Sequence, residues 1–296
     1  MSVVQTGTRN NDRSNDRHSE WASALFADGA IKVPGLLAPA MLAEVQACFE
    51  WSIANPGRAA TRIYPGTPDE HYNDISNPKA RAVYEPMLRA APFADLLAQL
   101  WGSEHVWYLG EELFVKEGGS VKRSPWHQDT AYGPFGGEHL ANVWISFDPL
   151  PKANSLEIVR GSHHGPLYDG AAYDDPDDDT KPMWGVQQMP RLPDIEAERR
   201  VDPHAWDVLS WPVEPGDVII CHSGALHGGA PVNAECPQRR TLVLRFWGDD
   251  AFYRPLPKSK PNYFHDVRDS VGRAAEVFGA MAPGDPFRLP RALQLR

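Results

Sequence analysis

The run DVIICHSGALHGGAPVNAECPQRRTLVLRFW, residues 217–247, joins two apolar stretches through a glycine-rich connection. Both stretches are short and rich in β-branched and aromatic residues, which is typical of buried strands. Similar runs, bounded by Gly, Pro, Asn or Asp, occur at 106–116, 142–150 and 155–159. Several short strands separated by turns predict a sandwich, jelly roll or barrel. Strands and helices do not alternate along the chain, which disfavours a doubly wound α/β fold.

The segment before these strands is mostly helical in pattern. Residues 37–53, LAPAMLAEVQACFEWSI, and 92–102, PFADLLAQLWG, each present an apolar stripe, and Gly102 is a typical helix end. Between them, residues 62–78, RIYPGTPDEHYNDISNP, are dense in turn-forming residues and predict a loop. A further helix is predicted at about 266–281. The sequence therefore predicts a mainly β fold with flanking helices.

Two polar segments stand out from this pattern. Residues 1–20 are rich in Asn, Asp, Arg and Ser and lack the apolar core of a secretory signal, so they predict a disordered tail. We expect residues 21–296 to form a single domain, with an acidic insert at about 168–200. Six aspartates lie between positions 169 and 179, and the insert has few apolar anchors apart from Met183 and Trp184. It predicts a mobile lid, with a solvated surface excursion as the alternative.

Composition limits the partners and the compartment. The chain has 296 residues, a formal net charge of -10 and three scattered cysteines without CxxC spacing. The acidic balance disfavours nucleic acid and anionic membrane surfaces as partners. No apolar run approaches the roughly 20 residues of a membrane-spanning helix. The cysteines disfavour a disulfide scaffold and fit a reducing compartment, so we expect a cytoplasmic protein.

A pair of ligand-type residues lies in SPWHQDTAYG, residues 124–133. On an extended strand, His127 and Asp129 would project from the same face, although such pairs often form only a surface hydrogen bond. His227 lies in the glycine-rich turn between the two apolar stretches of the run 217–247, and it would add a second imidazole. Two imidazoles and one carboxylate on one metal form a facial triad that suits non-haem Fe(II). Arg239 follows at the start of the next strand, where a guanidinium is able to hold a carboxylate.

These motifs resemble the phytanoyl-CoA dioxygenase (PhyH) family of Fe(II)/2-oxoglutarate-dependent oxygenases. The resemblance is carried by WHQD, by NVWISFDPL with NSLEIVRGSHHG, and by HSGALHGGAPVN with the following RR, and it extends over about residues 25–248. It implies a double-stranded β-helix, which is a cupin-like jelly roll. It also implies that His127, Asp129 and His227 bind Fe(II), and that 2-oxoglutarate and O₂ are cosubstrates.

The resemblance further implies a cosubstrate pocket. Arg239 would pair with the distal carboxylate of 2-oxoglutarate, and the neighbouring Arg240 competes for this role. Lys116 and Trp144 match positions that lie near the same cosubstrate in some relatives. The sequence presents no catalytic residue beyond the metal ligands.

The implied activity is hydroxylation of an unactivated C–H bond of a small-molecule metabolite, with succinate and CO₂ as co-products. The presence of Asp129 disfavours halogenation, in which a small residue replaces the carboxylate ligand. The alternative is a metal-dependent hydrolase or isomerase on a cupin-like barrel, because such a ligand set also suits Zn²⁺. Arg239 and Lys116 argue against it, and the intact ligand set argues against a non-catalytic binding protein. The acidic insert favours a neutral or cationic substrate over a CoA thioester.

Overall fold

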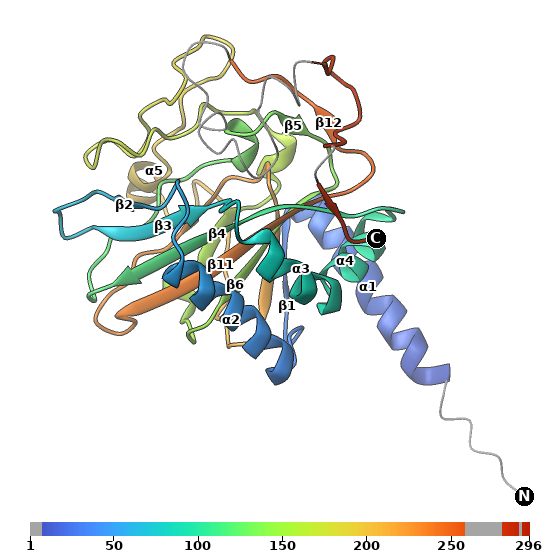
Figure 1. Ribbon diagram of the computed structural model, residues 1–296. Helices are drawn as coiled ribbons and strands as arrows, with labels where there is room; N and C mark the ends of the chain where they lie inside the picture. Colours follow the sequence, from blue (N-terminus) through green and yellow to red (C-terminus); the bar gives the residue numbers. More distant parts are fainter. Residues whose placement is uncertain (1–7, 258–279, 290–291) are drawn as a thin grey trace, which may run out of the picture.

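The computed structural model describes residues 8–257, 280–289 and 292–296, and its centre is an antiparallel sheet of eight strands (Figure 1). Along the sheet the strands are β1 (Ala30–Val33), β9 (Val218–His222), β6 (Leu140–Ser146), β11 (Gln238–Trp247), β4 (Trp107–Glu117), β3 (His71–Ile75) and β2 (Thr61–Ile63). Strand β13 (Leu293–Gln294) adds to β4. The chain order of neighbours is not sequential, as expected for a jelly roll.

Two smaller sheets complete the β structure. One contains β10 (His227–Gly229), β7 (Leu156–Val159) and β8 (Val208–Leu209), and the other pairs β12 (Phe252–Tyr253) with β5 (Phe135–Gly136). Residues of the large sheet and of β10 and β7 line the same cavity, so the two sheets face each other across it. The predicted fold class, a mainly β, cupin-like jelly roll with flanking helices, is confirmed, although the described strands do not close into a barrel.

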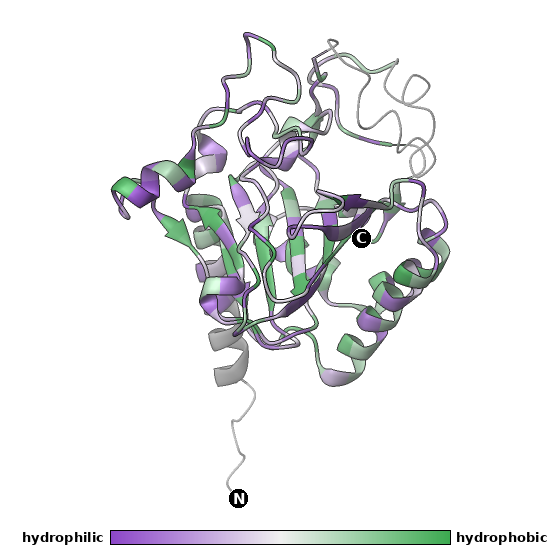
Figure 2. Cartoon of the chain, turned by 90° about the vertical axis from the view of Figure 1, so that its left-hand side faces the viewer, coloured by the Kyte–Doolittle hydropathy of each residue, from purple (hydrophilic) through white to green (hydrophobic). Residues whose placement is uncertain are grey.

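Helices cover the other face of the large sheet. They are α1 (Thr8–Asp28), α2 (Pro39–Ala54), α3 (Arg81–Ala90) and α4 (Phe93–Trp101), and the short α5 (Ile195–Val201) lies on the cavity side (Figure 1). Alternation along β11 separates the two faces: Leu242, Leu244 and Phe246 pack in the helix-side core, whereas Val243 packs in the cavity-side core. Hydrophobic residues accordingly fill the central strands in Figure 2.

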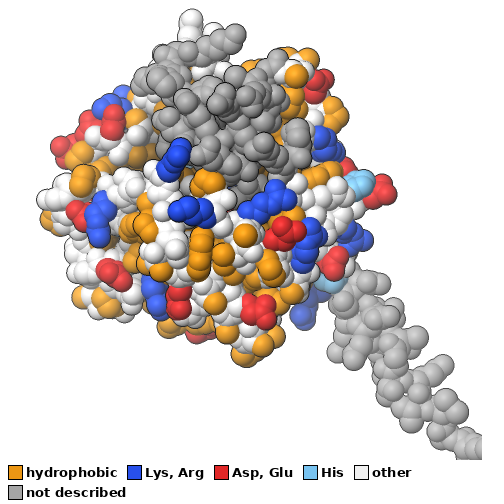
Figure 3. Space-filling model, viewed as in Figure 1, with side chains coloured by type: hydrophobic (Ala, Val, Ile, Leu, Met, Phe, Trp, Pro, Cys, Tyr) orange, Lys and Arg blue, Asp and Glu red, His pale blue; other side chains and the backbone are white. Residues whose placement is uncertain are grey.

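Three short 3₁₀ turns, Asp129–Ala131, Lys152–Asn154 and Ser162–His164, connect the strands. Charged side chains of both signs are interspersed on the face seen in Figure 3. No helix in the described part of the chain combines the length and apolar character needed to span a bilayer.

The expected strands at 106–116, 142–150, 155–159 and within 217–247 all occur, but the loop predicted at 62–78 is wrong. This segment contains β2 and β3, and β3 pairs with β4 through the backbone. Asn73 of β3 is buried and its amide donates to the Leu113 carbonyl at 3.2 Å. Side-chain hydrogen bonds and ladder pairing therefore outweigh the low strand propensity of the sequence HYNDI.

The amino-terminal segment differs from the predicted tail. Helix α1 begins at Thr8 and so occupies most of the range 1–20, while residues 1–7 lie outside the described residues. Leu25 is buried in the helix-side core and Trp21 packs against it. A helix anchored at one end propagates into polar sequence at low cost, because only nucleation is strongly unfavourable. The helix predicted at about 266–281 lies almost entirely outside the described residues.

The acidic insert at 168–200 is anchored by more apolar side chains than expected, so the prediction that it has few such anchors is wrong. Five of its apolar side chains are buried: Ala171, Trp184, Met189, Leu192 and Ile195. The buried Asp169 carboxylate accepts hydrogen bonds from the backbone N–H groups of Trp184 at 2.9 Å and Gly185 at 2.7 Å. The aspartates thus serve partly as backbone partners, which a count of charged residues does not reveal. A lid function for this insert stays a prediction.

Candidate metal centre and cosubstrate pocket

The two candidate histidine ligands are brought together by backbone pairing. His127 and His227 form an antiparallel bridge with reciprocal hydrogen bonds of 3.0 and 2.9 Å, and their ring centroids are 4.3 Å apart. His227 is the first residue of β10, so it lies in a strand rather than in the expected turn. Gln128 is extended, and its amide turns away to donate to the Gly224 carbonyl at 2.8 Å.

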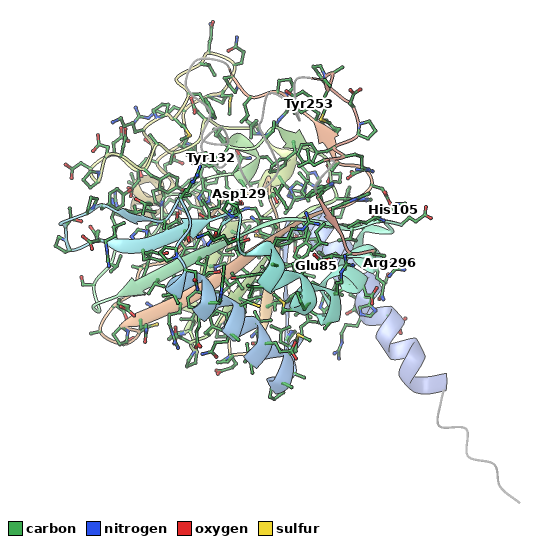
Figure 4. All side chains as sticks on the ribbon, viewed as in Figure 1. Glu85, His105, Asp129, Tyr132, Tyr253 and Arg296 are labelled. Carbon is green, nitrogen blue, oxygen red and sulfur yellow. The ribbon has the colours of Figure 1, made fainter. Side chains whose placement is uncertain are left out.

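Asp129 completes the cluster from the first position of the 3₁₀ turn that follows His127. Its Oδ1 atom lies 3.3 Å from His127 Nε2 and 3.8 Å from His227 Nε2. Figure 4 shows Asp129 between the large sheet and the loop layer above it. The three residues offer ligand atoms that all lie within 4.8 Å of one another. The structure therefore assembles the three residues that the sequence singled out.

The histidine protonation pattern suits a metal. The Nδ1 atoms of His127 and His227 each lie 2.9 Å from a backbone carbonyl, those of Pro125 and Ala225. Because a carbonyl only accepts, Nδ1 carries the proton in each ring and the Nε2 lone pair faces the cluster. Burial, aided by the neighbouring His127, lowers the pKa of His227 to about 4, so this imidazole is neutral at neutral pH. Imidazoles oriented in this way, with Nε2 towards the cluster, fit a divalent cation.

The carboxylate of Asp129 is held through its second oxygen. Oδ2 accepts hydrogen bonds from Asn142 Nδ2 at 2.9 Å and from Arg245 Nε at 2.8 Å, which leaves Oδ1 for a metal. Burial alone would raise the pKa of Asp129, but Arg245 and then the two histidines outweigh it and hold the pKa well below its usual value. Asp129 is therefore an anionic donor of fixed orientation.

Arg245 in turn bridges to a second carboxylate. Its guanidinium pairs with Glu112, and Glu112 Oε1 accepts from Asn73 Nδ2 at 2.9 Å. The sequence alone assigns neither Arg245 nor Asn142 to the metal site. Their positions follow from the register, because Asn142 of β6 lies directly opposite Arg245 of β11. That register is not readable from either strand alone.

Arg239 and Arg240 point to opposite faces of the large sheet. Arg239 is 3% exposed and lines the cavity, and its Nη1 donates to the carbonyls of Asn154 and Ala230 at 2.7 Å each. Arg240 pairs with Asp148 at 2.7 Å and does not line the cavity. A Cβ atom at Gly229 would lie 2.6 Å from Arg239 Nη2, so glycine there allows the guanidinium to approach the strand.

The two other expected cosubstrate residues differ in position. Trp144 is buried and lines the cavity. Lys116 lies directly opposite Arg239 in the β4–β11 register, but its Nζ donates to the Lys122 carbonyl at 2.6 Å and it is not among the described cavity-lining residues. Burial, followed by the charge of Arg239, lowers the pKa of Lys116 well below its usual value. Lys116 thus lies beside Arg239 on the neighbouring strand but does not line the pocket.

The cavity has a volume of about 340 Å³. It contains the three candidate ligands, Arg239 and Trp144, and it is also lined by Tyr132, Tyr173, Phe135, Leu109 and Ile75. Sequence reasoning missed further polar wall residues, among them His71 and Asn73, because their strand was predicted to be a loop. The volume lies at the lower end of the range of about 300–1,000 Å³ that is usual for small-molecule sites.

Other histidines are engaged by backbone groups. His222 Nε2 lies 3.0 Å from the Gly137 carbonyl, and its Nδ1 accepts from the Gly224 N–H at 2.9 Å. His163 and His164 both direct Nε2 to the Phe26 carbonyl, at 2.9 and 2.7 Å. These contacts give the three rings structural partners outside the cavity.

Comparison with known proteins agrees with this arrangement. The family model described as phytanoyl-CoA dioxygenase (PhyH) matches residues 26–241, and no curated protein matches. The non-haem epimerase SnoN from nogalamycin biosynthesis, solved with Fe³⁺, alpha ketoglutarate and nogalamycin RO, is similar at 19% identity and a TM-score of 0.65, covering 96% of this chain and 100% of that one.

Two further solved structures share the fold. The carbocyclase SnoK from nogalamycin biosynthesis has 17% identity and a TM-score of 0.64, with 94% of this chain and 96% of that chain covered. EctD from S. alaskensis, with 2-oxoglutarate and 5-hydroxyectoine, has 18% identity and a TM-score of 0.58, with 82% and 81% covered. From the family match over most of its length, the chain belongs to the phytanoyl-CoA dioxygenase family, whose members use Fe(II), 2-oxoglutarate and O₂.

Proposed function

We propose that this protein is an Fe(II)/2-oxoglutarate-dependent dioxygenase that hydroxylates an unactivated C–H bond of a small molecule. The observation that carries the proposal is one cavity that contains both the ligand cluster of His127, Asp129 and His227 and the guanidinium of Arg239. A chelating oxo acid requires both parts, because one end binds the metal and the other carries a carboxylate. A hydrolase has no use for the second part.

The ligand atoms would be His127 Nε2, Asp129 Oδ1 and His227 Nε2. Three protein ligands leave positions for the oxo acid and for O₂. When bound, Fe(II) with 2-oxoglutarate and O₂ supplies oxidation of a substrate C–H bond, with succinate and CO₂ as co-products. The chain supplies orientation: backbone carbonyls fix both imidazoles, and Asn142 and Arg245 fix the carboxylate. No residue is needed as a general base.

Arg239 is our choice for the distal carboxylate of 2-oxoglutarate. Two carbonyls hold its Nη1, so the guanidinium is oriented before the cosubstrate binds. Trp144 would form a wall of the same pocket. Lys116, beside Arg239 on the neighbouring strand, would not contact the cosubstrate directly. The opposite orientation of Arg240, in its ion pair with Asp148, supports this choice.

The charges around the cavity favour a small, neutral substrate. Glu112 is neutralised by Arg245, and Arg62 at the cavity wall pairs with Glu70 at 3.0 Å. With Fe(II) and 2-oxoglutarate bound, the positive charges are those of the metal, Arg239 and Arg245. They equal the negative charges of Asp129, Glu112 and the two carboxylates of the oxo acid, so the site is neutral as a whole. A charged substrate would then be buried without a counter-charge, which is costly.

All three cysteines are free, which suits the cytoplasmic location that the composition predicts.

A second outcome of the same chemistry is also supported. Two of the similar solved structures, which cover 96% and 94% of this chain, are called an epimerase and a carbocyclase. Removal of one hydrogen atom and return of another, with an external reductant such as ascorbate taking up the remaining two oxidising equivalents, would add no oxygen to the product. Removal of two hydrogen atoms with ring closure would also add none. Epimerisation or cyclisation is therefore the alternative to hydroxylation, and both require 2-oxoglutarate.

The test is a screen of neutral small molecules with Fe(II), 2-oxoglutarate and ¹⁸O₂, in which succinate and product mass are measured. Hydroxylation predicts succinate together with a product that carries one ¹⁸O atom. Succinate without added oxygen would favour epimerisation or cyclisation. A product formed without consumption of 2-oxoglutarate would refute the proposal in favour of a metal-dependent hydrolase or isomerase. Asp129→Ala is the control, which should form neither succinate nor product.

A further inference from the structure

Strained backbone is concentrated around the cavity. Within the described ranges, three residues other than glycine have positive φ angles: Tyr64 at 52°, Ser76 at 50° and Tyr173 at 58°. All three line the cavity that contains the candidate metal ligands. An L-residue in this region is disfavoured by contact between its Cβ and the backbone, and it persists only where the surroundings impose it. Such residues cluster at ligand sites, where the strain positions a side chain.

Tyr173 is the strained residue beside the ligand cluster. Its ring centroid lies 5.9 Å from that of His127, with an edge-on interplanar angle of 76°, and 6.3 Å from that of Tyr132. Burial raises the pKa of Tyr173 well above its usual value, with Tyr132, Glu112 and Asp129 contributing, so the phenol remains neutral. A neutral aromatic ring therefore borders the space next to the metal ligands.

Hydrogen bonds fix the backbone immediately before Tyr173. The hydroxyl of Tyr132 donates to the Ala171 carbonyl at 2.9 Å, and the N–H of Ala172 donates to the Lys181 carbonyl at 2.9 Å. The indole of Trp184 donates to the backbone carbonyl of residue 131, in the turn that carries Asp129, at 2.9 Å. This part of the acidic insert is thus tied to the metal-ligand segment, which holds in place the backbone that carries the Tyr173 ring.

The second strained tyrosine belongs to a different wall. Tyr64 follows β2, its hydroxyl donates to Asp179 Oδ1 at 3.3 Å, and Lys122 Nζ lies 4.4 Å from its ring centroid. Lys122 also pairs with Asp179 at 2.8 Å. These contacts join the connection after β2 to the acidic insert, so two strained tyrosines from distant parts of the chain border one space.

We propose that Tyr173 is a specificity-determining residue whose ring limits the size of the group admitted beside the metal. The inference rests on the proposed metal site. It assigns the substrate a slender C–H-bearing group, such as a methyl or methylene, at the position of oxidation. Larger groups would meet the ring, whose backbone is held by the hydrogen bonds at Ala171 and Ala172. The acidic insert then sets substrate size as a fixed wall.

The test uses Co(II) in place of Fe(II) and two metal-binding probes of different size, imidazole and 4-phenylimidazole, followed by the visible absorption of Co(II). Tyr173→Gly removes the ring and accepts the left-handed backbone. We expect it to bind 4-phenylimidazole about tenfold more tightly than the wild type, the order that pocket-size discrimination reaches, while imidazole affinity is unchanged. Tyr173→Phe should behave as the wild type. Tyr173→Asn, which also tolerates this backbone, replaces Tyr173→Gly if the latter does not fold.

Tyr168→Ala is the matched control, because Tyr168 lies in the same insert but is not among the described cavity-lining residues. Equal 4-phenylimidazole affinity in the wild type and Tyr173→Gly would overturn the proposal, as would an equal gain in Tyr168→Ala. The affinity for 2-oxoglutarate is measured in the same samples. If the wild-type protein bound Co(II) but not 2-oxoglutarate, the proposed function would be refuted. The proposal that Tyr173 limits the size of the admitted group would be unaffected. A wild-type protein that binds no Co(II) would overturn both.

Discussion

Arg245 lies between two buried carboxylates, and its removal gives a sharp test of the metal-ligand environment. We predict that Arg245→Leu destabilises the metal-free protein strongly. Arg245 Nε donates to Asp129 Oδ2 at 2.8 Å, and the same guanidinium pairs with Glu112. The side chains of Arg245, Asp129 and Glu112 are 14%, 7% and 12% exposed, so water does little to screen the charges that the substitution would leave.

The expected magnitude follows from this burial. Removing one partner of a buried ion pair costs about 3–5 kcal/mol, because the remaining charge is left without compensation. Here the substitution leaves two like charges close together, so the upper half of that range is expected. The double variant Arg245→Leu/Glu112→Leu removes one of these charges and should recover part of the loss. Asp129 would still accept a hydrogen bond from Asn142.

Urea denaturation of the metal-free proteins measures these free energies of unfolding. Arg89→Leu is the matched control, since Arg89 pairs with Glu85 at a similar distance of 2.7 Å but on the outer surface, where Figure 4 shows Glu85. An exposed pair of this kind contributes at most about 1 kcal/mol. If Arg245→Leu cost no more than Arg89→Leu, or if the double variant were no more stable than the single one, the reasoning would be refuted.

Two further predictions concern the cosubstrate and pH. Arg239→Ala should weaken 2-oxoglutarate binding to the Co(II) protein by roughly one to two decades, whereas Arg240→Ala should leave it unchanged; calorimetric titration showing the reverse would shift the role to Arg240. Stability of the metal-free protein should fall from pH 6 to 5, because burial lowers the pKa of His71 and His227 to about 4 and of His222 to about 3, so only the unfolded chain takes up these protons. Burial raises the pKa of Glu111 to about 7, which acts in the opposite direction, so the net loss is about 1–3 kcal/mol per pH unit. Urea denaturation measures the free energy of unfolding at the two pH values. A value that stays constant or rises from pH 6 to pH 5 would contradict the lowered pKa values assigned to these histidines.

The sequence predicted the strands that carry their own apolar pattern. It also predicted the spacing that places His127 and Asp129 together, because an i, i+2 relation on extended backbone is purely local. The alternation in β11 held a further signal: Leu242, Leu244 and Phe246 mark one face, so Arg239 must project from the other. Reading that alternation would have separated Arg239 from Arg240 before the structure was known.

Features that depend on pairing between distant strands were not predictable. Strand β3, which brings His71 and Asn73 to the cavity, forms because β4 offers a free edge, and its own sequence reads as a loop. The hydrogen bonds from Asn142 and Arg245 to Asp129 require the register between β6 and β11. The anchoring of the acidic insert depends on the hydrogen bonds that Asp169 accepts from the backbone N–H groups of Trp184 and Gly185, fifteen and sixteen positions further along the chain.

The central claim is that His127, Asp129 and His227 together hold one metal ion. Its most direct test is calorimetric titration of Co(II) into the wild type and into the three single alanine variants, under anaerobic conditions and with 2-oxoglutarate present. We expect one Co(II) per chain in the wild type and a loss of at least about 10–100-fold in affinity in each variant, since even outer-shell changes at metal sites cost this much. Wild-type affinity in His227→Ala, or in either of the other two variants, would contradict it.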